Sequence, residues 1–296
     1  MRGGNMDIDL EVIIEECIEI IKAKEVDKFD TAVLKIREHG AHAYELLCLA
    51  LKHADEFESM YLTHAVISIG EDILPHILKI LPELGGVSKS YVIAALGEIK
   101  SRAVIEPVKM AFDDPDSQVR QAVLQAIDKL NSTGEFDGEF EGILYKALND
   151  GDIYIRGCAA GILGDVGGEV ALDDLITMLT DAEPSVRAVA ARGIGRHRGE
   201  KAVAALKSLL DDPMAFVVSA ACLALAETGD ETLISEIARM LRHKSELVRL
   251  SAIKALGRMR RKQSIELLQP CLADENELVR TVAAQVIKFL TERVGA

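Results

Sequence analysis

The sequence has 296 residues and a formal net charge of −14, with 49% hydrophobic but only 4% aromatic residues and no tryptophan. This length exceeds the usual size of one compact core. The acidity argues against duplex DNA or an anionic membrane as the main partner, because phosphate groups must be met by lysine and arginine.

The acidic residues are concentrated in the first half of the chain. Residues 1–150 carry a net charge of −13, whereas residues 151–296 carry −1. No segment reaches the roughly 18 apolar residues that a membrane-spanning helix requires. We therefore expect no part of the chain to enter a membrane, and we expect residues 1–7 to be a flexible leader.

A helical segment rich in small residues recurs along the chain. Five copies align on positions 156, 187, 218, 249 and 280, which are 31 residues apart, and four of these positions are arginine. Position 120 is also arginine, and its distance of 36 residues from 156 places five extra residues in the segment 131–138. We call these six positions the Arg position. The copies are YLTHAVISIG (61–70), SYVIAALG (90–97), VRQAVLQAI (119–127), IRGCAAGILG (155–164), VRAVAARGIG (186–195), VVSAACLALA (217–226), VRLSAIKALG (248–257) and VRTVAAQVIK (279–288).

A second kind of helical segment precedes each later copy. Its apolar residues stand at i, i+3, i+4 and i+7, which is the pattern of a helix buried on one side. Asp-rich turns follow it, and glycines at 70, 97, 164, 195 and 257 follow the small-residue segment, where we expect left-handed helix caps. The second segments are AVIEPVKMAF (103–112), FEGILYKAL (140–148), ALDDLITML (171–179), AVAALKSLL (202–210), TLISEIARML (232–241) and SIELLQPCL (264–272).

The repeat resembles the HEAT repeat, in the short bacterial and archaeal form first recognised in phycobilisome lyase subunits. The resemblance is clear over residues 72–296 and looser over residues 8–70. It implies an all-α fold, an α-α superhelix of about nine helical pairs whose second helices line a concave face, because such pairs bury their apolar surface only by stacking. We expect acidic HEAT-like repeats over 8–130, an inserted loop or hinge at 131–138, and repeats over 139–296 continuous with the first half.

The resemblance also implies a ladder of Asp–Arg pairs between neighbouring repeats. Aspartate precedes arginine by six residues in four repeats, but Asp212 precedes Val218, and His243 precedes Arg249. We expect Asp212 to bond Arg249 across the repeat boundary, and we expect a structural role for the whole set. The ladder residues are Asp114, Arg120, Asp150, Arg156, Asp181, Arg187, Asp212, Arg249, Asp274 and Arg280.

The candidate binding surface lies one and five residues after the Arg position, because residues four apart share a helix face. We expect this face to line the concave groove and to bind an amphipathic helix or an extended segment of a protein partner. Exposure of both Leu223 and Leu250 would favour such a partner. If the assignment is shifted by one position, a neighbouring face lines the groove instead. The predicted residues are Gln121, Gln125, Gly157, Gly161, Ala188, Arg192, Ser219, Leu223, Leu250, Lys254, Thr281 and Gln285.

Basic residues gather around two inter-repeat turns of the second half. These turns are two repeats apart, so they should lie on one edge of the stack. They are either ordinary solvated turns or a docking edge for an acidic protein, with RNA a weaker alternative. The predicted basic edge consists of Arg196, Arg198, Lys201, Arg258, Arg260, Arg261 and Lys262.

The sequence contains no catalytic motif such as GxxxxGK[ST], GxSxG or HExxH. We expect no catalytic residue, cofactor or metal ion, and hence no enzyme. Histidines at 39, 42, 53, 64 and 76 lie near Cys48, but their spacing is irregular for a metal site. HEAT-like di-iron hydroxylases use His-Glu pairs, and no histidine here precedes glutamate. The five scattered cysteines indicate reduced thiols of a cytoplasmic protein.

Three functions remain open from the sequence. The first is a non-enzymatic scaffold or adaptor, a monomer that binds a protein partner in the concave groove. The second, implied by the family resemblance, is a phycobilin lyase-like or chaperone component. The third is nucleic-acid binding through the basic edge, which the net charge disfavours.

Overall fold

The computed structural model describes residues 4–23, 25–132, 134, 138–166 and 169–294. These residues form 18 α-helices, seven short 3-10 helices and no strand, so the predicted all-α fold is confirmed. The α-helices are α1 (Gly4–Lys22), α2 (Val26–His39), α3 (Ala41–His53), α4 (Glu56–Ile69), α5 (Leu74–Ile80), α6 (Gly86–Ile99), α7 (Ile105–Ala111), α8 (Ser117–Asn131), α9 (Glu141–Ala147), α10 (Ile153–Val166), α11 (Glu169–Met178), α12 (Pro184–Ile194), α13 (Glu200–Ser208), α14 (Ala215–Glu227), α15 (Ile234–Arg239), α16 (Glu246–Met259), α17 (Gln263–Leu268) and α18 (Glu277–Val294). The 3-10 helices are η1 (Gly70–Ile73), η2 (Leu81–Glu83), η3 (Arg102–Val104), η4 (Leu209–Asp211), η5 (Glu231–Leu233), η6 (Met240–Arg242) and η7 (Gln269–Ala273).

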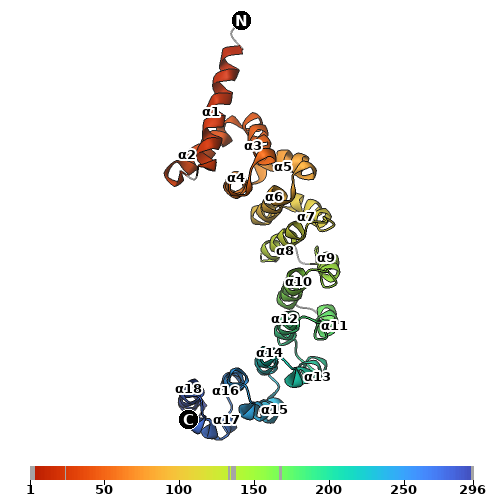
Figure 1. Cartoon of the computed structure of the whole chain (residues 1–296), viewed down its shortest axis with the longest axis vertical. Coiled ribbons are helices and arrows are strands. Elements are labelled where there is room, and N and C mark those ends of the chain that lie inside the picture. The colour runs from red at the N-terminus through yellow and green to blue at the C-terminus, as the bar shows by residue number, and fades with distance from the viewer. Residues whose placement is uncertain (1–3, 24, 133, 135–137, 167–168, 295–296) are drawn as a thin grey trace. The chain divides into compact units, whose positions relative to one another are not determined.

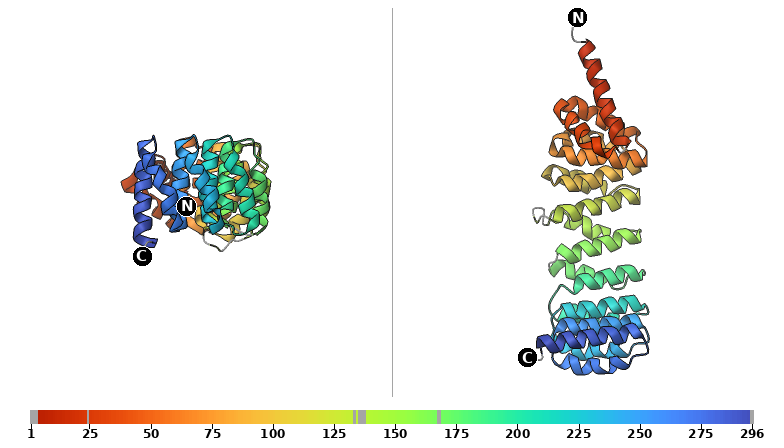
Figure 2. Two further views of the ribbon diagram at one scale, coloured as in Figure 1. Left: turned by 90° about the horizontal axis from the view of Figure 1, so that it is seen from below. Right: turned by 90° about the vertical axis from the view of Figure 1, so that its left-hand side faces the viewer.

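The chain divides into two compact units, unit 1 (Met1–Ile143) and unit 2 (Leu144–Ala296). In unit 2, α10, α12, α14, α16 and α18 pack one against the next and lie on the inside of the curve of this unit. We call them the inner helices of unit 2. The helices α11, α13, α15 and α17 form its outer row (Figures 1 and 2). In unit 1, α4 packs against α6 and α6 against α8.

The small-residue segments become the inner helices because two of their positions are buried in every copy. The residue before the Arg position is valine or isoleucine and is fully buried in all six copies from α8 to α18, as in Val186 and Val248. Three residues after the Arg position, an alanine is fully buried in α10, α12, α14, α16 and α18. A branched residue and a small residue on one face allow close stacking of parallel helices.

Glycines near the ends of these helices permit close approach between neighbours. A Cβ atom on Gly97 would lie 2.5 Å from the Cα atom of Ala126 on α8, and one on Gly164 would lie 2.5 Å from the Cα atom of Gly193 on α12. Side chains do not tolerate such short distances to backbone, so only glycine fits at these crossings.

The prediction that these glycines adopt left-handed helix caps is wrong for four of the five. Gly97, Gly164 and Gly257 lie inside α6, α10 and α16, and Gly195 has a φ of −59°. Only Gly70 has a positive φ, 79°. At the other four positions, glycine is therefore required by close packing against the neighbouring helix and not by a left-handed backbone conformation.

Two charged residues take the left-handed conformation instead. Lys100 ends α6 with φ 56° and ψ 38°, and Arg260 ends α16 with φ 53° and ψ 47°. This conformation costs a residue with a Cβ atom roughly 1 kcal/mol. The guanidinium carbon of Arg260 lies 5.8 Å from the ring centroid of Phe289, a cation–π distance that favours this conformation.

Residues 4–7, predicted as part of a flexible leader, open α1, and the flexibility of this segment stays a prediction. Residues 1–3 lie outside the described residues. The C-terminal half of α1 buries Ile14, Cys17, Ile18 and Ile21, and a helix anchored in this way extends at low cost, one hydrogen bond per residue.

The segment 131–138 is described only in part, because residues 133 and 135–137 lie outside the described residues. Gly134 and Gly138 have positive φ values of 72° and 80°. The hinge hypothesis for this segment stays a prediction. Within the described residues, no helix is both long and apolar enough to cross a membrane.

Candidate functional site

Neighbouring repeats of unit 2 are joined by bidentate Arg–Asp pairs. Arg156 donates from Nε and Nη2 to the Asp181 carboxylate at 2.7 and 3.0 Å, and Arg187 donates likewise to Asp212 at 2.8 and 3.0 Å. These four side chains are at most 15% exposed. The hydrogen bond from Arg156 holds the pKa of Asp181 below its usual value.

Each arginine also binds the turn of its own repeat. The Nη1 atoms of Arg156, Arg187 and Arg280 donate to the backbone carbonyl six residues earlier, at 2.9, 2.8 and 2.7 Å. The six-residue spacing in the sequence thus corresponds to a backbone contact. The carboxylate contact spans 25 residues and reaches the next repeat.

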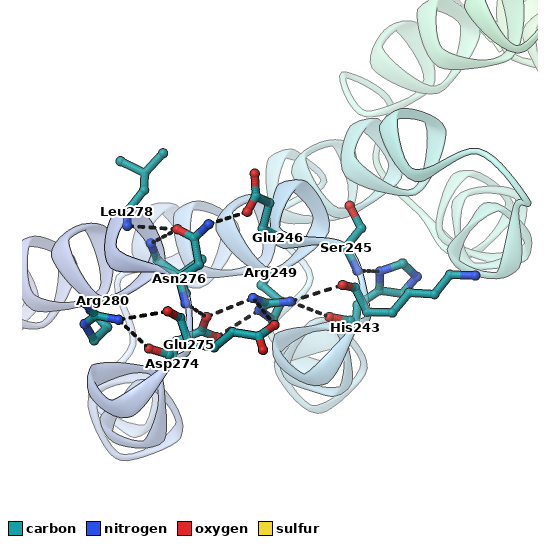
Figure 3. A network of polar contacts seen from close by, with 11 residues as sticks. His243, Ser245, Glu246, Arg249, Asp274, Glu275, Asn276, Leu278 and Arg280 are labelled. Carbon is teal, nitrogen blue, oxygen red and sulfur yellow. Dashed lines mark hydrogen bonds and ion pairs between the residues drawn. The ribbon is translucent and has the colours of Figure 1, made fainter.

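The predicted bond between Asp212 and Arg249 is wrong. Arg249 donates from Nε and Nη2 to Asp274, both at 2.8 Å (Figure 3), and Asp212 accepts from Arg187. The register is set by the stacking of the repeats, because Arg156, Arg187 and Arg249 each bind the carboxylate that stands 25 residues later.

The two departures from the pattern, Val218 and His243, stand at the two positions of a single Arg–Asp pair between repeats. His243 lies 25 residues after Val218 and therefore takes the place of its carboxylate partner. Val218 is buried, and His243 Nδ1 accepts the backbone N–H of Ser245 at 3.0 Å (Figure 3), as a turn aspartate would. A buried hydroxyl pair at the same boundary, Ser219 and Ser251 at 2.6 Å, supplies a polar contact there.

Unit 1 contains an ion pair between repeats that the sequence analysis did not predict. Lys89 donates to Asp114 at 2.6 Å, again across 25 residues. Burial raises the pKa of Asp114, but the hydrogen bond from Lys89 and others outweigh burial and leave it lowered. Arg120 donates to the carbonyl oxygens of Asp114 and Pro115, both at 3.0 Å. The signal was available, since Lys89 directly precedes the copy SYVIAALG.

The predicted groove residues lie on the inner helices with graded exposure. Five residues after the Arg position, the side chains are exposed except at Gly161 and Leu223, which are half-buried. One residue after it, most are half-buried, Ser219 is buried, and Thr281 is exposed. Leu250 is half-buried. The second set is thus partly covered by the neighbouring helix.

A row of exposed apolar side chains was absent from the predicted groove. Phe216, Leu247 and Leu278, two residues before the Arg position, are 39, 43 and 56% exposed. We call these three residues the apolar row. Tyr154 is 68% exposed at the equivalent place on α10. Steps of three and seven residues keep this position on the same helix face as the predicted groove residues. The signal was the 31-residue interval between 216, 247 and 278.

The predicted basic edge is largely paired with carboxylates of the preceding repeat. All eight side chains of these pairs are 44–62% exposed, so each pair contributes at most about 1 kcal/mol and chiefly neutralises charge. His197 adds no charge at neutral pH, because burial lowers its pKa. Arg198 and Lys262 are exposed. The pairs are Arg196–Asp165, Lys201–Asp173, Arg258–Glu227 and Arg261–Glu231.

Two of the five early histidines line a hollow of about 490 Å³ in unit 1. His42, Cys48 and Lys52 of α3 and His76 of α5 line it. Within the described part of the chain, no three His, Cys, Asp or Glu side chains are arranged to hold a metal ion. Burial raises the pKa of Cys48 to about 12, so its thiol stays protonated at neutral pH.

The comparisons with known proteins concern the fold. The model of HEAT repeats matches residues 141–221 and 217–288, which together are half of the chain. The structure is similar to that of YibA from Escherichia coli, with 16% identity, a TM-score of 0.58, and coverage of 88% of this chain and 96% of that one. It is also similar to an engineered protein, with 18% identity, a TM-score of 0.52, and coverage of 88% and 81%. Human deoxyhypusine hydroxylase in complex with glycerol aligns over 98% of this chain and 100% of that one at 18% identity, but the TM-score is 0.39. No curated protein matches the sequence significantly.

Proposed function

Because the chain belongs to the HEAT-repeat family, we propose that it is a non-enzymatic scaffold or adaptor that binds a protein partner on the inner helices of unit 2. HEAT repeats generally mediate protein interactions. The observation that carries the proposal for this chain is the apolar row, Phe216, Leu247 and Leu278.

The apolar row forms part of a larger apolar surface. The half-buried Leu223 and Leu250 lie on the same helix faces, so α14, α16 and α18 all contribute to it. Large side chains repeated at one position on three stacked helices form a contiguous surface. Contiguous apolar surface rimmed by polar residues marks interaction sites in soluble proteins.

The other functions have less support. Nucleic-acid binding needs cations free to meet phosphates, and four of the seven residues of the basic edge are paired with carboxylates. No described residue favours bilin handling. A cytoplasmic location belongs to the proposal, since the five free cysteines suit a reducing compartment.

The test compares two double variants of the full chain as baits in native lysate. Leu247→Glu with Leu278→Glu charges the apolar row. Leu267→Glu with Leu272→Glu is the matched control, because these leucines lie on α17 and η7 in the outer row and are 37 and 41% exposed. Retained proteins are identified by mass spectrometry after nuclease treatment, and binding is then repeated with each purified candidate.

We expect one protein to bind the wild type and the outer-row control and to be lost from the Leu247→Glu, Leu278→Glu variant. Retention by all three baits would place binding elsewhere and contradict the proposal. Retention of nucleic acid alone would favour the third function.

A further inference from the structure

The apolar row has a band of negative charge on one side. The first turns of α16 and α18 carry the exposed carboxylates of Glu246 and Glu277. Figure 3 shows Glu246 and Leu278 pointing to the same side, away from the bonds between Arg249 and Asp274. Lys244 and Glu275, which stand two residues before these glutamates, are also exposed, so the four residues carry a net charge of −2.

A band of positive charge lies on the other side. Lys254 stands seven residues after Leu247 on α16, about 10 Å further along the helix. Arg192 holds the equivalent position on α12, and on α18 Lys288 stands three residues after the equivalent position, which is Gln285. All three are exposed, and among the described residues none of them forms an ion pair. The surface therefore changes from acidic through apolar to basic along the inner helices.

The distance between neighbouring members of the apolar row indicates which backbone conformation a bound partner segment has. Its members stand at one position of stacked helices, and packed helices lie about 8–10 Å apart. In an α-helix, residues seven apart share a face and are separated by about 10.5 Å. In a β-strand, residues on one face are about 6.8 Å or 13.6 Å apart, and neither distance lies within the range of about 8–10 Å between packed helices. A polyproline helix repeats at about 9.3 Å but is held by aromatic-lined grooves, whereas leucine predominates here.

Building on the proposed function, we infer that unit 2 receives an acidic amphipathic α-helix of its partner, laid across α14, α16 and α18. Its apolar residues at i, i+7 and i+14 contact the apolar row. Its carboxylates lie on the flank that faces Arg192, Lys254 and Lys288. Neutral or basic residues lie on the flank that faces Glu246 and Glu277.

The experiment selects the occupant by its chemistry. A display library of random 20-residue peptides is panned against the full-length protein, and the enriched peptides are synthesised with a fluorescent label. Circular dichroism shows whether they gain helix on binding, and fluorescence anisotropy measures Kd at low and high salt. The variants are Leu247→Glu, the charge reversal Arg192→Glu with Lys254→Glu, and the control Lys207→Glu on the exposed surface of α13.

We expect enriched peptides with apolar residues at heptad spacing, a net negative charge, and helix formed on binding. Leu247→Glu should weaken their binding at least tenfold. The double charge reversal should do the same at low salt, with recovery when the peptide glutamates are replaced by lysine, and Lys207→Glu should have no effect. No enrichment, proline-rich or basic peptides, or insensitivity to the charge reversal would each overturn the inference.

The two proposals fail separately. If a lysate partner depends on Leu247 and Leu278 but the library yields no acidic helix, the scaffold function stands and the inference about the helix is wrong. If the library yields such helices while no lysate protein depends on these leucines, the inference stands and the scaffold function fails.

Discussion

Removal of one ladder arginine measures what holds neighbouring repeats together. Arg187 makes four hydrogen bonds, two to the Asp212 carboxylate and two to the carbonyl oxygens of Asp181 and Ala182. The side chains of Arg187 and Asp212 are only 12 and 6% exposed. Arg187→Met keeps the aliphatic stem and leaves a nearly buried carboxylate without its cation.

The expected cost is about 3 kcal/mol, the lower end of the range for breaking a buried ion pair, because the pair is not fully buried. The matched control is Arg280→Met. Arg280 makes the same two carbonyl bonds, at 2.7 and 3.1 Å, and within the described residues it has no ion pair. Its loss should cost about 1 kcal/mol, so the difference of roughly 2 kcal/mol measures the carboxylate contact.

Urea unfolding followed by circular dichroism at 222 nm gives both values from the shift in midpoint. Combining Arg187→Met with Asp212→Asn completes a double-mutant cycle, and the double variant should lose less stability than the two single variants together. Equal losses for Arg187→Met and Arg280→Met, or strict additivity in the cycle, would refute a stabilising role for the carboxylate contact.

Four further outcomes are expected. Burial raises the pKa of Asp212, but the bonds from Arg187 and the backbone outweigh burial and leave this pKa below its usual value. The contribution of Asp212 to stability is therefore present above the usual aspartate pKa and is lost as the pH falls below it, which acid titration of ellipticity would show. Lys100→Gly relieves a left-handed conformation and should stabilise by about 1 kcal/mol in urea. Gly164→Ala forces α10 away from α12 and should lower the thermal midpoint. Iodoacetamide at pH 8 should label exposed Cys158 long before Cys222, because burial raises the pKa of the Cys222 thiol to about 12. Mass spectrometry of digests gives the order of labelling, and earlier labelling of Cys222 would contradict this prediction.

The repeat architecture could be predicted because its signal is local and periodic. Arginine at 156, 187, 249 and 280, together with the buried valine or isoleucine before it, requires only that each helix bury the same face. Leu223 and Leu250 were assigned to the binding face for the same reason, and the structure leaves them half-buried.

The candidate binding surface was predicted only in part. The helix faces were assigned from residues four apart. This spacing groups residues into faces but leaves open, by one residue position, which face is exposed. Phe216, Leu247 and Leu278 fall on that face because the neighbouring inner helix covers the residues one after the Arg position more than those two before it. The direction in which a neighbour lies is a property of the stack.

By itself, the sequence determined the two-helix repeat, its 31-residue interval and the kind of residue at each position, because each depends on a helix burying one side. Only the tertiary structure decided which aspartate each arginine binds, since Arg156 and Arg187 have an aspartate both six residues before and 25 residues after them in the sequence. It also decided that Gly97 and Gly164 permit close packing, whereas a charged residue, Lys100, takes the left-handed cap. Both depend on distances between repeats, which helix periodicity does not contain.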